Sequence, residues 1–279
     1  MTAPMLSRIS VSNIAWVAEE DEAVAALLVR RGVMAIEVAP ARLFADPITA
    51  TTAEIEKIRA FWSGHGIRIA AMQGLLFGRP DFALFADDSA RDAMSDYLRR
   101  VIALAGQLGC GPLVFGSPTN RRRGPLPLDE AYRRAADFFR PLAEFAHDHR
   151  CVLCFEPNAS AYGCDFVQKL SEAAVLAQRV AHPAFGVQLD VGNFMMEHDE
   201  IADVRAAALL IGHCHASAPN LSLLGEAPTL LGSMVAAANA GGYRGLISIE
   251  MHRPAGRSVI AALERALDYV SETVTAADD

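Results

Sequence analysis

Four acidic or imidazole residues in the second half of the chain stand out because each follows a short apolar run. Glu156 comes after Cys-Val-Leu-Cys-Phe, Asp190 after Val-Gln-Leu, and Glu250 after Ile-Ser-Ile, while His215 lies in Ile-Gly-His-Cys-His. Carboxylates that are buried against one another repel strongly unless a cation neutralises them. If the four runs are neighbouring strands of one parallel sheet, the four side chains converge and predict a divalent metal site.

The donor set of Glu156, Asp190, His215 and Glu250 is rich in oxygen, with one imidazole and no thiolate. Hard carboxylate oxygens suit Mn²⁺ or Mg²⁺, and the imidazole also admits Co²⁺. We therefore predict Mn²⁺, with Mg²⁺ or Co²⁺ as alternatives, in preference to structural zinc, which favours Cys and His. Each residue alone has an ordinary explanation as well, because an acidic residue after a strand commonly caps a helix, and Asp190-Val-Gly-Asn193 also fits a turn.

The elements that must position these residues alternate regularly along the chain. Short apolar runs predict buried parallel strands, and amphipathic stretches between them predict helices. The predicted strands are 8–12, 33–38, 67–72, 111–115, 151–155, 186–189, 210–214 and 246–249. The predicted helices are 20–31, 53–63, 90–108, 129–149, 171–180, 201–209, 229–240 and 258–275, the second opened by a capping box at Thr51-Thr-Ala-Glu54.

Eight strand–helix units in 279 residues predict the α/β class and a single (β/α)₈ TIM-barrel domain over 1–279. A doubly wound open sheet gives the same local pattern, but no G-x-G-x-x-G or Walker-type loop follows the first strand. In a parallel barrel the active site forms at the carboxyl ends of the strands. The four candidate ligands are placed at that end.

The composition excludes several classes of protein. Hydrophobic residues make up 52% and charged residues 21%, which is ordinary for a globular domain. No uninterrupted apolar stretch is long enough for a transmembrane helix, and a formal net charge of -8 argues against a nucleic-acid binder. The first eight residues show no export signal, and five cysteines without a disulfide spacing suit reduced thiols, so we expect a cytoplasmic protein. Cys151 and Cys154 would point to opposite faces of a strand, which argues against a shared metal or redox pair.

Several segments of the chain, including those around the four candidate ligands, resemble the sugar phosphate isomerase/epimerase family. These are the xylose isomerase-like barrels, which include the ketose 3-epimerases. The four residues are separated by 34, 25 and 35 positions, similar to the spacing in ketose 3-epimerases. The resemblance extends over nearly the whole chain and implies that the four residues are the metal ligands and that the protein is a homodimer or homotetramer. The segments that carry it are Ser12-Asn-Ile-Ala-Trp16, Ala35-Ile-Glu-Val-Ala-Pro40, Phe115-Gly-Ser-Pro-Thr-Asn-Arg121, Glu156-Pro-Asn158 with Tyr162-Gly-Cys-Asp-Phe166, Leu189-Asp-Val-Gly-Asn193, Gly212-His-Cys-His-Ala-Ser217 and Ser248-Ile-Glu-Met251.

The resemblance implies a divalent-metal-dependent isomerase or epimerase of a sugar or small polyhydroxy ketone. Glu156 and Glu250 would be its catalytic acid/base pair: one takes a carbon-bound proton to give an enediolate that the metal stabilises, and the other returns a proton. Return from the opposite face epimerises the substrate, and return at the adjacent carbon isomerises it. A metal-dependent lyase or dehydratase is the alternative, because an enediolate can also expel a β-hydroxyl.

Two further alternatives are a non-enzymatic barrel and an endonuclease IV-like phosphodiesterase. The phosphodiesterase would need a three-zinc cluster with more histidines and a basic surface facing DNA. Eight histidines and a net charge of -8 argue against it. We expect a carbohydrate-like small-molecule substrate, with no nucleic-acid or membrane partner.

Three positions depart from the ketose 3-epimerase pattern. Asn193 stands where these enzymes usually carry a substrate-contacting His, Leu221 where they carry an Arg, and Tyr162 where they carry a Glu. Two polar contacts to a sugar are thereby missing. Residues at or near the predicted strand ends are candidate substrate contacts, with local turn and cap hydrogen bonds as the alternative; they are Asn13, Glu37, Gln73, Ser117, Asn158, Asn193 and His213. The run Arg121-Arg-Arg123 would either dock an anionic group or form a solvated loop.

Overall fold

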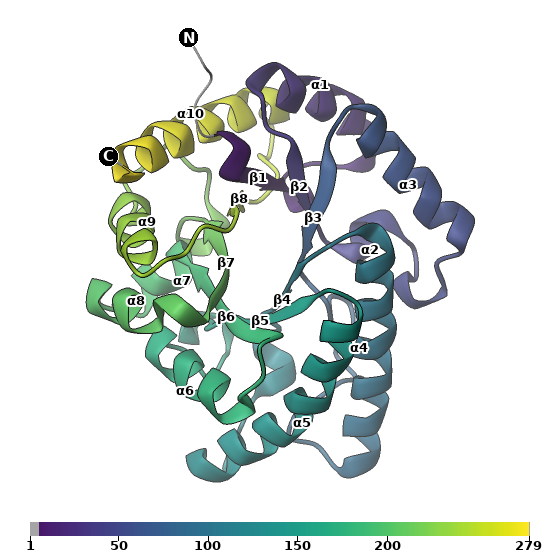
Figure 1. Cartoon of the computed structure of the whole chain (residues 1–279), viewed down its shortest axis with the longest axis vertical. Coiled ribbons are helices and arrows are strands. Elements are labelled where there is room, and N and C mark those ends of the chain that lie inside the picture. Colours follow the sequence, from purple (N-terminus) through teal and green to yellow (C-terminus); the bar gives the residue numbers. More distant parts are fainter. Residues whose placement is uncertain (1–5, 279) are drawn as a thin grey trace.

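The barrel predicted from the alternating pattern is present. In the computed structural model, which describes residues 6–278, eight strands form a closed barrel in the order β1 to β8, and every neighbouring pair is parallel. Figure 1 shows the strands at the centre and the helices as a ring around them. Most of the segment considered for an export signal, residues 1–5, and residue 279 lie outside the described residues.

All eight predicted strands are found, with bounds that differ by one or two residues. The strands are β1 Ile9–Ser12, β2 Ala35–Val38, β3 Arg68–Met72, β4 Pro112–Phe115, β5 Val152–Phe155, β6 Phe185–Asp190, β7 Ile211–Ala216 and β8 Ile247–Ile249. Strands β6 and β7 extend further than predicted at their carboxyl ends. Because of this extension, Asp190 and His215 belong to paired strands of the barrel, which fixes the direction of their side chains.

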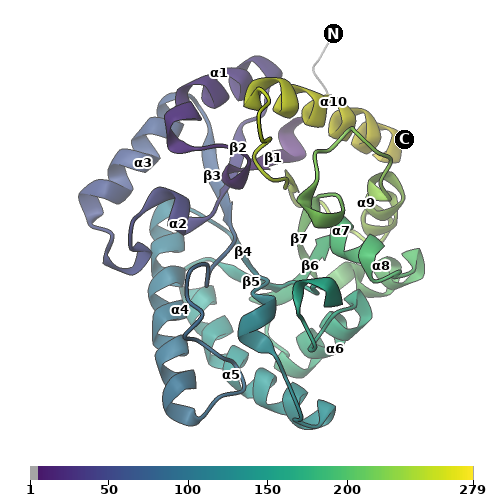
Figure 2. The ribbon, with the colours of Figure 1, turned by 180° about the vertical axis from the view of Figure 1, so that it is seen from behind.

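Ten α-helices are found among the described residues: α1 Asp21–Arg31, α2 Pro40–Leu43, α3 Thr52–Gly64, α4 Asp88–Leu108, α5 Leu128–Asp148, α6 Leu170–Val180, α7 Val191–Met196, α8 Ile201–Ala207, α9 Leu231–Ala240 and α10 Val259–Asp278. The capping box before α3 is present, since the Thr51 hydroxyl accepts from the Glu54 amide and the Glu54 carboxylate accepts from the Thr51 amide. The short helices α2 and α7 were not predicted, and both lie inside the ring of longer helices (Figure 2). Helix α8 is shorter than predicted and gives way to a 3₁₀ turn at Ala208–Leu210.

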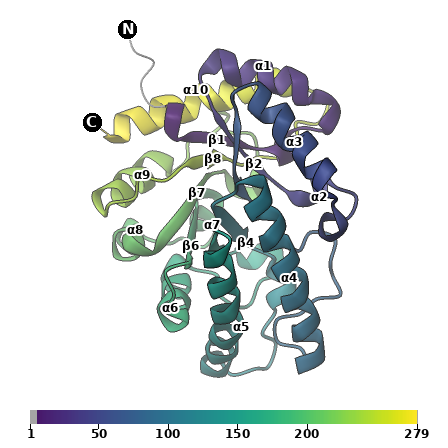
Figure 3. The same ribbon diagram turned by 45° about the vertical axis from the view of Figure 1, so that its right-hand side comes forward.

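Apolar side chains fill the layer between the strands and the helices. Phe139 on α5 packs with ring centroids 4.9 Å from Phe115 on β4, 5.4 Å from Phe155 on β5 and 5.4 Å from Phe185 on β6. One aromatic ring thus ties a helix to three consecutive strands, burying area that stabilises the barrel wall. The long helices α4 and α5 lie side by side, and α10 lies beside α1 (Figure 3). None of the helices in the described part is long and apolar enough to cross a membrane.

The inside of the barrel, in contrast, holds polar side chains. Alternate residues of a strand point to opposite faces of the sheet, so one face of each strand is directed inward. Several strand residues with polar side chains are fully buried: Ser10, Ser12, Glu37, Gln188, His213, His215 and Ser248. Polar groups shielded from water in this way need partners, and several of them meet at the site described below.

All five cysteines are buried and none forms a disulfide. Burial raises the pKa of the Cys151 thiol to about 11 and that of the Cys154 thiol to about 12. The two thiols contact different backbone carbonyls: Cys151 Sγ lies 3.2 Å from Cys110 O, and Cys154 Sγ lies 3.7 Å from Val152 O. They are therefore packed as separate core residues.

Candidate metal centre

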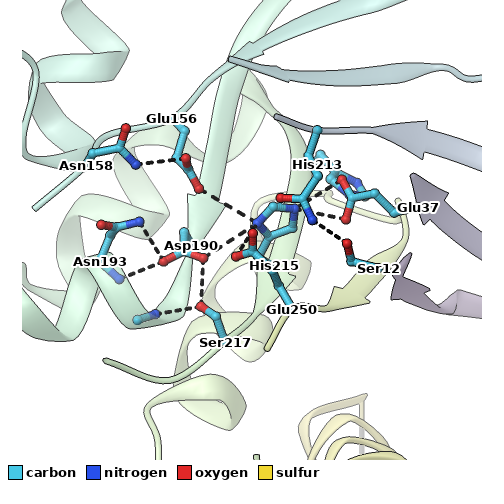
Figure 4. A network of polar contacts seen from close by, with 12 residues as sticks. Ser12, Glu37, Glu156, Asn158, Asp190, Asn193, His213, His215, Ser217 and Glu250 are labelled. Atoms are coloured by element: carbon cyan, nitrogen blue, oxygen red, sulfur yellow. Dashed lines mark hydrogen bonds and ion pairs between the residues drawn. The ribbon is translucent and has the colours of Figure 1, made fainter. Parts of the chain in front are cut away.

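The four candidate ligands converge at the carboxyl end of the barrel. Glu156 follows β5, Asp190 ends β6, His215 lies in β7 and Glu250 follows β8, and one donor atom of each lies within 4.8 Å of all the others. Nδ1 of His215 lies 3.1 Å from Glu250 Oε2, 3.6 Å from Asp190 Oδ2 and 3.7 Å from Glu156 Oε1. Figure 4 shows the three carboxylates directed toward the His215 ring.

The electrostatics of this cluster call for a cation. Burial, together with the charges of Asp190 and Glu250, raises the pKa of Glu156 to about 8, and burial also raises the pKa of Glu250. Burial alone would lower the pKa of His215, but Glu37 and Glu250 outweigh it and raise that pKa well above its usual value. The protein therefore retains protons where a divalent ion would supply positive charge. In charge, donor type and spacing, the four residues fit such an ion.

Asp190 is held in one orientation by hydrogen bonds to both of its oxygens. Its Oδ1 accepts from the amide nitrogen of Asn193 at 2.6 Å and from the side-chain Nδ2 of Asn193 at 2.9 Å. Its Oδ2 accepts from the Ser217 hydroxyl at 2.7 Å, and that hydroxyl accepts in turn from the Gly192 amide. Asp190 is thus both the N-cap of α7 and a member of the cluster, so the two explanations open at the sequence level hold together.

His215 is oriented from the opposite side of its ring by Glu37. His215 Nε2 lies 3.1 Å from Glu37 Oε2, which leaves Nδ1 facing the three acidic donors. His213 Nε2 lies 3.3 Å from Glu37 Oε1, and all three side chains are fully buried. Burial alone would raise the pKa of Glu37, but the imidazoles of His215 and His213 outweigh it and hold that pKa well below its usual range. When a carboxylate accepts a hydrogen bond from the second ring nitrogen of a metal-binding histidine, this contact fixes the tautomer of the histidine.

Glu156 is braced by a buried chain of two residues. Asn158 Nδ2 donates to Glu156 Oε2 at 2.8 Å, and Asn158 Oδ1 accepts from the Arg121 guanidinium at 2.9 Å. Arg121 is fully buried over the Phe155 ring, with its Cζ 4.5 Å from the ring centroid, and burial lowers its pKa. The solvated-loop explanation is therefore wrong for Arg121, because its side chain is buried in the core and donates to Asn158, while the anion-docking alternative stays a prediction.

The remaining candidate substrate contacts are placed in different ways. Asn13 accepts from the Ala39 amide at 2.8 Å and Asn193 accepts from the Ala159 amide at 2.9 Å, so both side chains join neighbouring loops. Ser117 is half-buried, with a left-handed φ of 50°. Gln73 donates to the Ser12 hydroxyl and lines a cavity next to Glu250. As substrate contacts, all seven residues stay predictions.

The cavity beside Glu250 has a volume of about 640 Å³ and opens between the loops that follow β1, β2, β3, β7 and β8. This volume is in the range of small-molecule sites. Its lining residues are Ile14, Ala39, Ala41, Arg42, Gln73, Gly74, Phe77, Leu221, Glu250 and His252.

Comparison with known protein families identifies the family of this barrel. A family model described as the xylose isomerase-like TIM barrel matches residues 25–272. The chain belongs to this family. The family resemblance seen in the sequence is thereby confirmed. A comparison with curated protein sequences gives no match.

Solved structures similar to this xylose isomerase-like barrel include several sugar epimerases. L-ribulose 3-epimerase has a TM-score of 0.81 at 18% identity, covering 98% of this chain and 96% of that one. The 3-keto-D-glucoside 4-epimerase from E. coli has a TM-score of 0.75 at 15% identity, covering 96% and 99%. The IOLI protein, whose structure is described with a binding zinc atom, has a TM-score of 0.78 at 15% identity, covering 96% and 98%. At these identities the likeness establishes the fold.

The sequence did not reveal the supporting roles of three residues in this xylose isomerase-like barrel: Ser217, Gly116 and Arg121. Ser217 has a usable signal, because strand alternation extended past β7 places it on the same face as His213 and His215. Gly116 follows β4 so closely beside Glu156 that a Cβ there would overlap Glu156 Oε2. No local pattern marks Gly116 or Arg121, since each is defined by a residue about 40 positions away.

Proposed function

We propose that the protein is a divalent-metal-dependent isomerase or epimerase acting on a sugar or a small polyhydroxy ketone. The observation that carries this proposal is the convergence of Glu156, Asp190, His215 and Glu250 at the carboxyl end of the barrel, with their donor atoms within 4.8 Å of one another. The similar structures that are sugar epimerases support the choice of reaction and a carbohydrate-like substrate.

We assign these four side chains as metal ligands, with His215 binding through Nδ1, and Mn²⁺ as the preferred ion. Three carboxylate oxygens and one imidazole form a donor set suited to Mn²⁺, Mg²⁺ or Co²⁺. When bound, the ion would act as a Lewis acid that holds substrate oxygens and stabilises negative charge on them.

Glu156 and Glu250 are the residues that we assign to proton transfer. In the metal-free site, burial and neighbouring carboxylates raise the pKa of Glu156 to about 8, and burial raises the pKa of Glu250 as well. Two carboxylates that face one substrate position can serve as the base and the acid of a proton transfer. One of them takes the proton from the carbon next to the substrate carbonyl, giving an enediolate, and the other returns a proton. Asn158 holds Glu156 in place, and Glu250 faces the cavity from which the substrate enters.

Solvent exchange tests the proposal. The purified protein, incubated in D₂O with Mn²⁺ and ketoses of four to six carbons, is expected to incorporate deuterium at the carbon beside the carbonyl, as measured by mass spectrometry. Glu156→Gln and Glu250→Gln should each slow exchange by on the order of 10²–10⁴-fold. The matched control is Glu144→Gln, an exposed glutamate on α5, which should exchange normally.

Product analysis separates this proposal from its alternative. An epimer or an aldose–ketose pair supports the proposed reaction, whereas loss of a β-hydroxyl would identify a lyase or dehydratase. A protein that binds no divalent ion and catalyses no exchange in any of these ketoses would contradict the proposal.

A further inference from the structure

The cavity beside the acidic cluster is walled mainly by apolar side chains. Ile14, Ala39, Ala41, Phe77 and Leu221 line it, while Glu250 at its inner end belongs to the metal site. A compound bound at the cluster therefore extends into this cavity. The chemistry of the walls then determines which part of a substrate they can accept.

Leu221 is fixed in the wall by its neighbours. Its amide donates to Ala218 O at 2.9 Å, and its carbonyl accepts from the His252 amide at 2.9 Å. The preceding residue, Asn220, donates its amide to the Tyr162 hydroxyl at 3.1 Å. Tyr162 thus anchors the loop that presents Leu221 to the cavity.

Besides Glu250 of the metal site, three polar side chains line this cavity and could bind hydroxyls: Arg42, Gln73 and the exposed His252. The side chains of Asn13, Asn158 and Asn193 are engaged with other protein atoms, and Gln73 donates to Ser12. Arg42, exposed near the mouth, donates to the Ile14 carbonyl at 3.4 Å. A polyhydroxylated tail would lose its water here and regain few hydrogen bonds, which is unfavourable.

Phe77 gives an independent indication. Its side chain is 75% exposed, although it is a large apolar ring at the entrance to a cavity. An apolar group seated against Phe77 and Leu221 would remove both surfaces from water, which favours binding. The same loop contributes Gln73 to the wall, so the Phe77 ring and Glu250 border one cavity.

We propose that the substrate is a sugar derivative or small polyhydroxy ketone whose far end carries an apolar alkyl or aryl substituent, seated between Phe77 and Leu221 on the side of the carbonyl away from the metal. This inference rests on the proposed function, because it takes the reacting end of the substrate to lie at the four-ligand cluster. It specifies the other end, which the four ligands do not determine.

Two ketones that share the same reactive group test this inference. Both 1-hydroxy-4-phenyl-2-butanone and erythrulose present a hydroxymethyl ketone, but the first continues as an apolar chain with a phenyl ring and the second as hydroxylated carbons. Deuterium exchange of the hydroxymethyl protons is followed by mass spectrometry with Mn²⁺-loaded protein. We expect a KM at least about tenfold lower for the phenyl compound, the effect of burying one ring.

Variants locate the effect. Leu221→Arg and Phe77→Ser should each raise the KM of the phenyl compound about tenfold, while the KM of erythrulose stays the same or falls. The matched control is Leu209→Ser, which removes a leucine that is 92% exposed and does not line this cavity. That variant should leave both KM values unchanged.

The outcomes separate the inference from the proposed function. If the KM of erythrulose is equal to or lower than that of the phenyl compound, the inference of an apolar substituent is wrong and the proposed function stands. If neither compound exchanges, the proposed function fails for this class of ketone, and calorimetric titration of both compounds into the same Mn²⁺-loaded protein decides the preference of the cavity. Tighter binding of the phenyl compound there supports the apolar cavity, and equal or weaker binding overturns it.

Discussion

Glu37 lies on β2, which is not a neighbour of β7 in the barrel, yet it determines which nitrogen of His215 is available. Its carboxylate lies 3.1 Å from His215 Nε2, so the opposite nitrogen faces the acidic donors. The same carboxylate lies against His213, whose ring is fully buried. Glu37 is therefore a positioning residue, and the properties of His215 depend on it.

We predict that Glu37→Gln lowers the affinity for Mn²⁺ by about 10–100-fold. The substitution removes the negative charge of Glu37, and this charge both orients His215 and increases the basicity of its ring. Isothermal titration calorimetry on metal-free protein measures this. Glu144→Gln, an exposed change of the same chemistry, is the control. An unchanged affinity in the folded Glu37→Gln protein would exclude the positioning role.

The raised pKa of Glu156 gives a pH dependence with a defined sign. Its pKa is about 8 in the folded, metal-free protein against an ordinary value of 4.5, so the folded state holds a proton that the unfolded state releases. The contribution to stability is complete below pH 4.5 and is lost as the pH rises to about 8. His215, whose pKa is also raised, acts in the same direction above its ordinary value of 6.5.

We therefore predict that the melting temperature of the protein in EDTA falls as the pH rises from about 5 to about 8, and that Mn²⁺ restores it at pH 8. Glu156→Gln should show a shallower fall and a smaller response to Mn²⁺. Thermal denaturation followed by circular dichroism checks both. A melting temperature that rises over this range in EDTA would show that the carboxylates are not held together as described.

At the scale of the elements, the end of β4 determines how closely Glu156 can approach the barrel. A Cβ on Gly116 would overlap Glu156 Oε2, which is the far end of a flexible side chain. The carboxylate can turn away without disturbing the backbone, but it then leaves the cluster. A Cβ on Gly192, in α7, would instead lie 2.7 Å from the backbone oxygen of Ala218, where relief requires movement of the chain.

We predict that Gly116→Ala folds with nearly normal stability but loses at least about tenfold in Mn²⁺ affinity. Gly192→Ala is expected to lower the free energy of unfolding by about 1–3 kcal/mol because it overpacks the α7 contact. The matched control is Gly64→Ala, at the last position of α3, where a Cβ meets no atom within 4 Å. Urea denaturation and calorimetric Mn²⁺ titration separate the two effects, and a Gly116→Ala protein with full affinity would refute the steric account.

The predictable part of the fold is the part determined by local periodicity. Short apolar runs identified all eight strands, and long amphipathic stretches identified the helices around them. Helix α7 was not predicted because it has six residues, too few to show a helical period, and begins at Val191, directly after Asp190 of β6, without a linker. Helix α2 is shorter still.

The candidate ligands could be identified because barrel geometry brings strand ends together wherever the strands lie in the sequence. Their supporting residues could not be identified in this way. Glu37 is 178 residues from His215, and Arg121 reaches Glu156 only through Asn158. Such pairings depend on side-chain directions across the barrel, which one sequence does not reveal.

At the scale of the whole molecule, closure of the barrel makes the two ends of the chain interdependent. Strand β1 pairs with β8, and helix α10 packs against both α1 and α9. The site draws residues from β2, β5, β6, β7 and β8, so its geometry requires the closed ring. The homodimer or homotetramer implied by the family resemblance stays a prediction.

We predict that Leu267→Ala, on the fully buried face of α10, lowers the free energy of unfolding by about 2–5 kcal/mol. The substitution leaves a void in the outer layer of the barrel, away from the four metal ligands. The Mn²⁺ affinity of the folded fraction should therefore change by less than about twofold. Urea denaturation and calorimetry measure these quantities. Leu209→Ala, at a 92% exposed position, should change stability by no more than about 0.5 kcal/mol. A large loss of metal affinity in Leu267→Ala would mean that α10 shapes the site directly.

The five buried cysteines have a practical consequence. Thiol reagents act on exposed thiolates, and these side chains are shielded, with the pKa values of Cys151, Cys154 and Cys214 raised by burial to between about 11 and about 12. A cysteine introduced at Leu209 would therefore be the one site open to maleimide coupling in the native protein. A fluorophore or spin label can thus be attached at a chosen point without first removing any of the natural cysteines.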